Sequence, residues 1–310
     1  MQKQNLLAIS VLLLGAITVT IPSVAHAQIL VAQKATATTG AYQKSQQLQK
    51  LLREGRSLMD AGNLSSAIAR YQQATKLSPK NARIFATIGY LQAIRKNFSA
   101  AVGAYKQAVA LAPTHADFYY ALGYTLANAG DNRAAADAYR RTTELDRRNL
   151  NAYLGYGVIA LRKKNYQEAA WAYEHALSLD SENASVYELM GTVALNQGQF
   201  SKAIAALQKS AALNPNNSKV LVNLASAWQN QGNSTAAVMT LRQVAQLNPR
   251  NAKVYMQIGE ILKTQNDIQG ALDAYQRALS VEPNSTEARK AMSDLLLSQP
   301  GSDRRIAPQL

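Results

Sequence analysis

The sequence contains no cysteine, which excludes disulfides, thiolate nucleophiles, cysteine-ligated metal sites and lipid attachment through cysteine. Phenylalanine and tryptophan are scarce, with four and two residues, whereas tyrosine occurs fifteen times. This aromatic balance suits half-buried helix surfaces better than a dense globular core. The stability of the fold must therefore come from packing alone.

Acidic residues are absent from two long stretches, residues 61–116 and 189–259, and the formal net charge of the chain is +14. An excess of positive charge favours anionic partners such as acidic proteins, anionic lipid surfaces, acidic polysaccharides or nucleic acid. The basic residues are scattered and do not form one stripe. A merely solubilising role for this charge therefore stays open beside a role in binding.

Residues 1–27 have the pattern of a secretory signal peptide. A lysine precedes an apolar run over residues 6–21, a proline then breaks the run, and Ala25 and Ala27 form an A-x-A cleavage pattern. We expect cleavage before Gln28 and export to the periplasm or the cell exterior. The alternative is an uncleaved N-terminal membrane anchor, because the apolar run is nearly long enough to span a bilayer.

A sequence pattern recurs with a period of 34 residues between positions 48 and 285. The seven copies have no insertion or deletion between them and cover residues 48–81, 82–115, 116–149, 150–183, 184–217, 218–251 and 252–285. A fixed period of this length indicates a solenoid, in which each repeat buries its apolar face against the next.

Each repeat carries the same types of residue at the same positions, numbered 1 to 34. Position 8 is Gly or Ala, position 20 is always Ala, position 24 is Tyr or Leu, and position 27 is mostly small. Small residues opposite a large one allow two helices to approach closely. Gly at position 15 and Pro at position 32 are typical of the ends of a first and a second helix.

Five residues depart from these end signals. Lys96, Lys164 and Asn266 replace glycine at position 15, which we expect to reduce stability without changing the fold. Arg147 and Ser181 replace proline at position 32 of the third and fourth repeats, so the signal that ends the second helix is weaker there.

The residue types at positions 8, 20, 24, 27 and 32 of this 34-residue unit resemble the tetratricopeptide repeat (TPR) family. The resemblance implies an all-α, right-handed α-solenoid of seven helix-turn-helix repeats. Residues 286–299 are similar to the capping helix that closes such arrays. Residues 28–47 and 300–310 show no periodicity, and we expect a flexible linker and a disordered tail.

The sequence carries no motif for catalysis, metal binding or cofactor binding. HExxH, a glycine-rich phosphate loop and G-x-S-x-G are all missing. Of the three histidines, His26 belongs to the predicted signal peptide, His115 lies at a repeat boundary and His175 follows Glu174 on a charged helix face. We therefore expect no catalytic residue, no metal and no cofactor, and a protein that is not an enzyme.

The resemblance also implies that the first helices line a concave groove, which family members use to hold a peptide or helix of a partner protein. Positions 2, 5, 9, 12 and 13 would face this groove. The candidate residues at these positions are Tyr90, Tyr120, Tyr124, Leu154, Val158, Leu161, Asn196 and Asn230. An aromatic and apolar patch there is typical of a binding site, although some rings could instead pack between adjacent first helices.

These features predict a non-catalytic scaffold that holds a protein or peptide partner in its groove. The alternative is a cell-envelope assembly component that binds an anionic polymer or lipid surface through its basic faces. A third hypothesis is self-association of arrays into a structural oligomer. Export argues against nucleic acid as a partner, while the partner's identity, the oligomeric state and peripheral membrane contact are left open.

Overall fold

The structure, a computed structural model, describes residues 24–298, with side chains from residue 38 onward. These residues form fifteen α-helices and contain no β-strand. The chain divides into two compact parts, Met1–Pro79 and Lys80–Leu310. Most of the predicted signal peptide and the predicted tail at 300–310 lie outside the described residues.

The N-terminal part consists of a long helix, α1 (Val24–Asp60), packed against α2 (Leu64–Leu77). Helix α1 runs through residues 28–47, where we expected a flexible linker, so that expectation is wrong. No proline interrupts this stretch, and its Ala, Gln, Leu and Lys residues have high helix propensity. The side chains of residues 38–47 are exposed, which explains why no apolar period marks the helix.

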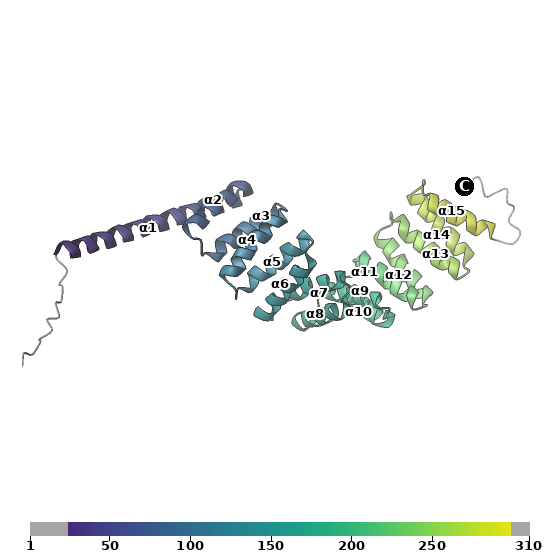
Figure 1. Ribbon diagram of the computed structural model, residues 1–310. Coiled ribbons are helices and arrows are strands. Elements are labelled where there is room, and N and C mark those ends of the chain that lie inside the picture. Colours follow the sequence, from purple (N-terminus) through teal and green to yellow (C-terminus); the bar gives the residue numbers. More distant parts are fainter. Residues whose placement is uncertain (1–23, 299–310) are drawn as a thin grey trace, which may run out of the picture. The chain divides into compact units, whose positions relative to one another are not determined.

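The C-terminal part contains six helix pairs in succession, followed by a single helix (Figure 1). The first helices are α3 (Ala82–Ile94), α5 (Ala116–Ala129), α7 (Leu150–Arg162), α9 (Ala184–Asn196), α11 (Ser218–Asn230) and α13 (Ala252–Thr264). The second helices are α4 (Phe98–Leu111), α6 (Asn132–Leu145), α8 (Tyr166–Leu179), α10 (Phe200–Leu213), α12 (Ser234–Leu247) and α14 (Ile268–Val281). The last helix is α15 (Thr286–Leu297). This architecture confirms the predicted all-α fold class.

Asparagine at position 34 fixes where most first helices begin. The side-chain oxygens of Asn81, Asn149 and Asn183 accept hydrogen bonds of 3.0 to 3.2 Å from backbone N–H groups two or three residues further on. Such caps satisfy N–H groups that have no partner inside the helix. As a result, α3, α7 and α9 each begin at the first residue of a repeat.

The turn between the two helices of a repeat is left-handed at position 15 in all seven repeats. Four repeats place glycine there, and Lys96, Lys164 and Asn266 adopt the same conformation with φ of 60°, 58° and 61°. A side chain in this region costs about 1 kcal/mol relative to glycine. The three substitutions are therefore accommodated without any change of turn.

Aspartate compensates for the missing prolines of the third and fourth repeats. Helices α6 and α8 end at position 30, as the other second helices do. The carboxylates of Asp146 and Asp180 then accept hydrogen bonds from the backbone N–H groups of Arg148, at 2.9 Å, and Glu182, at 3.3 Å. These turns end the helices where Arg147 and Ser181 stand in place of proline.

The two helices of each repeat are held together by the contact between positions 8 and 24. The alanines at position 20 are all fully buried, and the large side chains at position 24 are between 0 and 7% exposed. In the seventh repeat, a Cβ atom added at Gly259 would lie 2.5 Å from the ring of Tyr275. Only glycine lets the ring approach the helix so closely.

The first helices of successive repeats also contact one another, from α3 through α5, α7 and α9 to α11. No two consecutive second helices make comparable contacts among the described residues. The first helices therefore form the more closely spaced layer, and positions that point away from the second helices form a continuous surface on it.

We expect Gly259→Ala to lower the free energy of unfolding by about 1–3 kcal/mol, because the added methyl group overpacks the buried ring of Tyr275. The hydroxyl of Tyr275 donates a 2.7 Å hydrogen bond to Glu260, which restrains the ring from moving away. Urea denaturation followed by circular dichroism measures the change. Gly103→Ala is the matched control, since nothing lies within 4 Å of its added Cβ and the exposed helix should become more stable. Equal stability of the two variants would contradict this account of position 8.

We expect Lys164→Gly to raise the free energy of unfolding by about 0.5–1 kcal/mol, because it relieves the left-handed strain at position 15. Lys163→Gly removes the same charge from the preceding residue, whose φ is −80°, and should give no such gain. Thermal and urea denaturation of the two variants separate the effect of strain from that of charge. A gain in stability for Lys163→Gly without a gain for Lys164→Gly would refute the strain argument.

Candidate functional site

An open pocket with a volume of about 380 Å³ lies on the C-terminal part, between helices α3, α4 and α5. Its lining is almost entirely aromatic and apolar. The residues that line it are Tyr90, Ala93, Ile94, Tyr105, Tyr120, Ala121, Tyr124 and Thr125. The structure thus brings together the three tyrosines that the sequence placed in the groove.

Tyr90 and Tyr124 are the most accessible rings of this pocket, at 53% and 51% exposed. Both occupy position 9 of their repeats, on the first helices α3 and α5. A ring that is half exposed contributes little to the packing of its own repeat. These two tyrosines therefore present apolar area and a hydroxyl group to solvent, a combination well suited to contact with a partner.

Tyr120 contacts both the protein core and the pocket. It is half-buried, and its ring packs against the core residue Tyr139 with the centroids 5.9 Å apart. Burial raises the pKa of Tyr120, and the neighbouring Tyr124 adds to the increase. Tyr120 therefore belongs partly to the core, as the alternative interpretation of the sequence held, and partly to the pocket lining.

Tyr105 closes the pocket from the second helix α4. Its side chain is buried, and burial together with the nearby Tyr90 raises the pKa of Tyr105 to about 12. The phenol therefore keeps its proton at physiological pH. The one hydroxyl in the lining that does not belong to a tyrosine, that of Thr125, donates to the carbonyl of Ala121 at 2.7 Å.

Ile94 is a large, exposed pocket residue that is not among the predicted candidates. It is 48% exposed and occupies position 13 of the second repeat, one of the positions expected to face the groove. The positional rule alone would have found it, because an isoleucine left exposed at such a position adds to the neighbouring aromatic patch.

The candidates of the fourth repeat lie outside this pocket. Leu154 and Leu161 are half-buried and pack against the core cluster that contains Tyr153 and Val186. Val158 is half-buried as well. These side chains therefore serve the packing between α7 and its neighbours at least in part.

The polar candidates occupy the exposed surface of α9 and α11. The amide nitrogens of Asn196 and Asn230 donate to the carbonyls of Thr192 and Ser226, four residues back, at 2.8 and 2.7 Å. One of the two N–H donors of each amide is thereby used within the helix. The amide oxygens remain the atoms suited to accept hydrogen bonds from a partner.

An ion pair between Glu188 and Lys219 joins the fifth and sixth repeats within the layer of first helices. Glu188, whose side chain is only 13% exposed, accepts from Lys219 at 2.8 Å and from Asn217 at 3.2 Å. Position 5 of the fifth repeat therefore connects α9 to the start of α11, and its carboxylate is already satisfied by protein groups.

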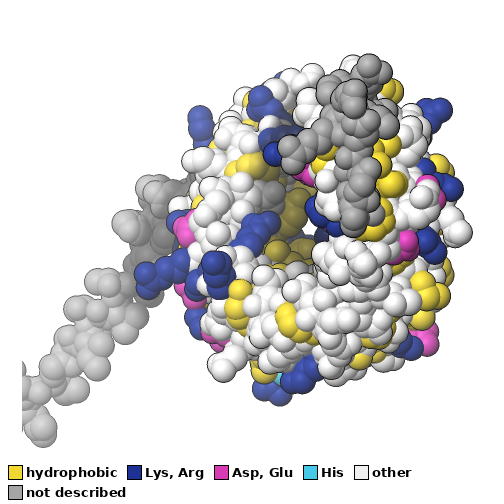
Figure 2. Space-filling view, turned by 90° about the vertical axis from the view of Figure 1, so that its right-hand side faces the viewer, with side chains coloured by type: hydrophobic (Ala, Val, Ile, Leu, Met, Phe, Trp, Pro, Cys, Tyr) yellow, Lys and Arg dark blue, Asp and Glu magenta, His cyan; other side chains and the backbone are white. Residues whose placement is uncertain are grey.

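Charge is spread over the surface and not concentrated at the tyrosine pocket. Figure 2 shows Lys and Arg side chains dispersed over the visible face, with fewer Asp and Glu among them. In residues 24–298, no three His, Asp or Glu side chains gather into a set that could hold a metal ion. The same residues include no helix with both the length and the hydropathy that crossing a membrane requires.

Comparisons with known proteins agree with this architecture. The family model of the Cilia and flagella-associated protein 70 C-terminal domain matches residues 23–295. No curated protein matches the chain. Among solved structures, the C-terminal part of a TPR repeat-containing protein from Cytophaga hutchinsonii is 17% identical with a TM-score of 0.68, over 78% of this chain and 99% of that one.

Two further structures are similar. YrrB, described as a TPR protein with an unusual peptide-binding site, is 24% identical with a TM-score of 0.53, over 61% of this chain and 98% of its own. PilF of Pseudomonas aeruginosa is 23% identical with a TM-score of 0.54, over 69% and 97%. At these identities the likeness establishes the fold alone. The chain belongs to the tetratricopeptide repeat family, through the family of the Cilia and flagella-associated protein 70 C-terminal domain.

Proposed function

We propose that this protein is a non-catalytic scaffold that holds an apolar segment of a partner protein in the tyrosine pocket between α3 and α5. The tetratricopeptide fold serves as a scaffold for protein–protein interactions and implies protein or peptide partners. The observation that carries the proposal is the grouping of three large exposed side chains, Tyr90, Ile94 and Tyr124, around one pocket.

Exposed side chains of this size are costly to leave in water, and their clustering makes a single apolar contact area available to a partner. Tyrosine supplies much contact area for few rotatable bonds, so little conformational entropy is lost when a partner binds. The helices that carry the rings are packed in place beforehand. The partner therefore bears most of the ordering cost, and the scaffold provides a preorganised surface.

The composition of the first-helix surface also suggests what the partner looks like. Towards α9 and α11 the exposed positions are polar, with Asn196 and Asn230 able to accept hydrogen bonds through their amide oxygens. We infer that a partner long enough to reach them places apolar side chains at Tyr90 and Tyr124 and polar or backbone groups at the asparagines.

We further propose that the protein acts after export. The support is the apolar run at residues 6–21 followed by Ala25 and Ala27 in an A-x-A pattern. An exported scaffold would meet partners in the cell envelope or outside the cell.

We expect Tyr90→Ala combined with Tyr124→Ala to weaken the binding of partner peptides by about tenfold or more, since each ring contributes on the order of 1 kcal/mol or more as an interface anchor. Peptides would be selected from a random phage-displayed library on the wild-type protein, and their affinities measured by fluorescence polarisation. Because both rings are about half exposed, helical circular dichroism should be unchanged.

Met239→Ala combined with Leu247→Ala is the control, because these side chains are exposed on α12, away from the pocket. It should leave the affinities unchanged. Binding to the folded tyrosine variant with wild-type affinity would refute the pocket as the binding site. A steep loss of wild-type binding with added salt would instead favour the hypothesis of an anionic polymer or lipid surface.

We expect the exported form of the protein to begin at Gln28. N-terminal sequencing and intact mass of the protein recovered from the cell envelope or medium test this directly. Ala27→Gln should block processing, because a large polar residue does not fit the small-residue requirement of the cleavage site. Recovery of the wild-type protein with residues 1–27 still attached would support the membrane-anchor alternative.

A further inference from the structure

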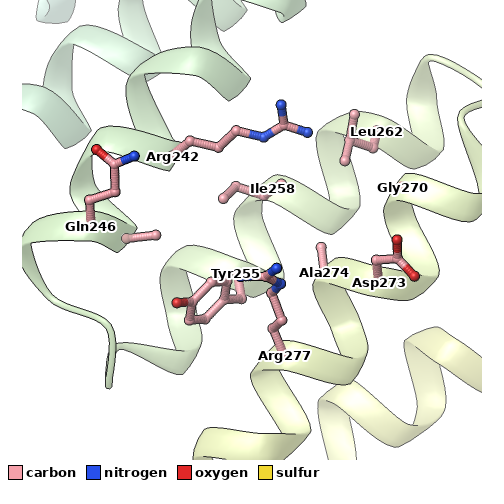
Figure 3. A pocket seen from close by; sticks show the side chains of 10 residues that line it. Arg242, Gln246, Tyr255, Ile258, Leu262, Gly270, Asp273, Ala274 and Arg277 are labelled. Atoms are coloured by element: carbon pink, nitrogen blue, oxygen red, sulfur yellow. The ribbon is translucent and has the colours of Figure 1, made fainter.

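We propose that a second site, the cleft between α12 and α14, binds an acidic peptide segment that carries an apolar side chain beside its carboxylate groups. The cleft has a volume of about 390 Å³ (Figure 3). Arg242 and Gln246 line it from α12, Tyr255 from α13, and Asp273 and Arg277 from α14. The site does not depend on the tyrosine pocket, and its test is independent of the function proposed above.

The cleft lies on the opposite side of α13 from the groove surface. Tyr255, Ile258 and Leu262, which line the cleft, are three and four residues apart and so share one face of the helix. Glu260 and Lys263, at groove positions 9 and 12, lie on another face of α13. A ligand in the cleft would therefore leave the groove surface free.

The same place in the fourth repeat is filled by aromatic rings. Residues 102 positions before Tyr255, Asp273 and Arg277 are Tyr153, Trp171 and His175. The rings of Trp171 and His175 lie with centroids 4.3 Å apart, and both contact Tyr153 at centroid distances of 5.8 and 5.4 Å. The fold can close this place with its own side chains, and the seventh repeat does not do so.

The third repeat has the same three residue types as the seventh, namely Tyr119, Asp137 and Arg141, but there the charges are neutralised internally. Arg141 pairs with Glu144 at 2.8 Å, and Asp137 pairs with Arg140 at 2.6 Å.

In the seventh repeat the residue equivalent to Glu144 is Ser280. Neither Arg242 nor Arg277 forms an ion pair within the residues that the structure describes. Two guanidinium groups thus face one cleft without a carboxylate partner.

The chemistry of the cleft points to carboxylates next to an apolar group. The planar donors of arginine match the geometry of a carboxylate, and the amide of Gln246 and the hydroxyl of Tyr255 add further donors. The floor is apolar, since Ile258 and Leu262 are buried below the charged rim. A peptide can offer both groups at once, whereas a polysaccharide offers no alkyl side chain and a membrane surface cannot enter a cleft.

Asp273 is the one acidic residue in the lining, and replacing it provides a further test in which binding should become tighter. Its carboxylate accepts a 3.0 Å hydrogen bond from Gln269 on the same helix. It opposes the arginines electrostatically and should weaken the binding of an acidic peptide. No acidic residue occurs in the preceding segment 189–259, and Asp267, which accepts a 3.0 Å hydrogen bond from the backbone of the lining residue Gly270, is a second carboxylate near the cleft.

The probe is a dye-labelled, terminally blocked octapeptide in which two glutamates flank one leucine between glycine and serine residues, and full-length protein is titrated by fluorescence polarisation. We expect Arg242→Gln combined with Arg277→Gln to weaken its binding about tenfold, as expected for lost charge-assisted hydrogen bonds. Asp273→Asn should tighten binding about twofold to threefold.

The chain supplies a matched control at the corresponding positions of the second and third repeats. Lys106→Gln combined with Arg141→Gln removes the same charge 136 residues earlier, and it should leave the affinity within twofold of wild type. A control peptide with glutamine in place of glutamate should bind at least tenfold more weakly than the acidic one. Circular dichroism of both double variants should equal that of wild type.

Several results would overturn the proposal. One is a folded Arg242/Arg277 double variant that binds the acidic peptide as wild type does. Another is an equal loss of affinity in the Lys106/Arg141 control variant, because the loss would then follow from the lower net charge of the protein and not from the cleft. A third is absence of peptide binding together with binding of phosphatidylglycerol vesicles that the Arg242/Arg277 substitutions abolish, since the ligand would then be a lipid surface.

Discussion

The close contact between a small residue at position 8 and a large one at position 24 is the constraint on which the rest of the structure depends. It sets the spacing of the two helices in each repeat, and the chain has no disulfide to hold them otherwise. Because the contact recurs every 34 residues, each repeat presents its remaining positions in the same orientation. The exposed positions are thereby free to vary in chemistry without affecting the fold, and they supply the accessible side chains of both proposed sites, such as Tyr90 and Arg242.

Much of this could be predicted from the sequence, because the signals for it are local. The period, the capping asparagines such as Asn81 and the left-handed position 15 identify both helices of every repeat. Helix α1 over residues 28–47 could not be predicted in this way, since an apolar period reports only a buried face and these exposed side chains have none. Likewise, Asp146 and Asp180 end their helices through side-chain hydrogen bonds that a search for proline does not reveal.

In the candidate site, too, the features with a local sequence signal could be predicted and those that depend on packing could not. Tyr90 and Tyr124 were predicted from register, because a groove position depends only on the repeat. The partial burial of Tyr120 against Tyr139 depends on packing between two helices, which the sequence does not report. The cleft of the seventh repeat is harder to predict from the sequence than the tyrosine pocket. Arg277 has no carboxylate partner among the described residues because Ser280 stands where the third repeat has Glu144, and such a difference matters only once the arginine is placed in space.

The strong helix contacts within the C-terminal part join only the same or consecutive repeats. A repeat can therefore be gained or lost as a block of 34 residues with the contacts at its two boundaries remaining of the same kind. Duplication of such a block would lengthen the binding surface by one step, and later substitutions at exposed positions would give the new copy its own chemistry. The third, fourth and seventh repeats differ in this way at one equivalent place. Ion pairs neutralise its charges in the third repeat, aromatic rings fill it in the fourth, and it is an open cleft in the seventh.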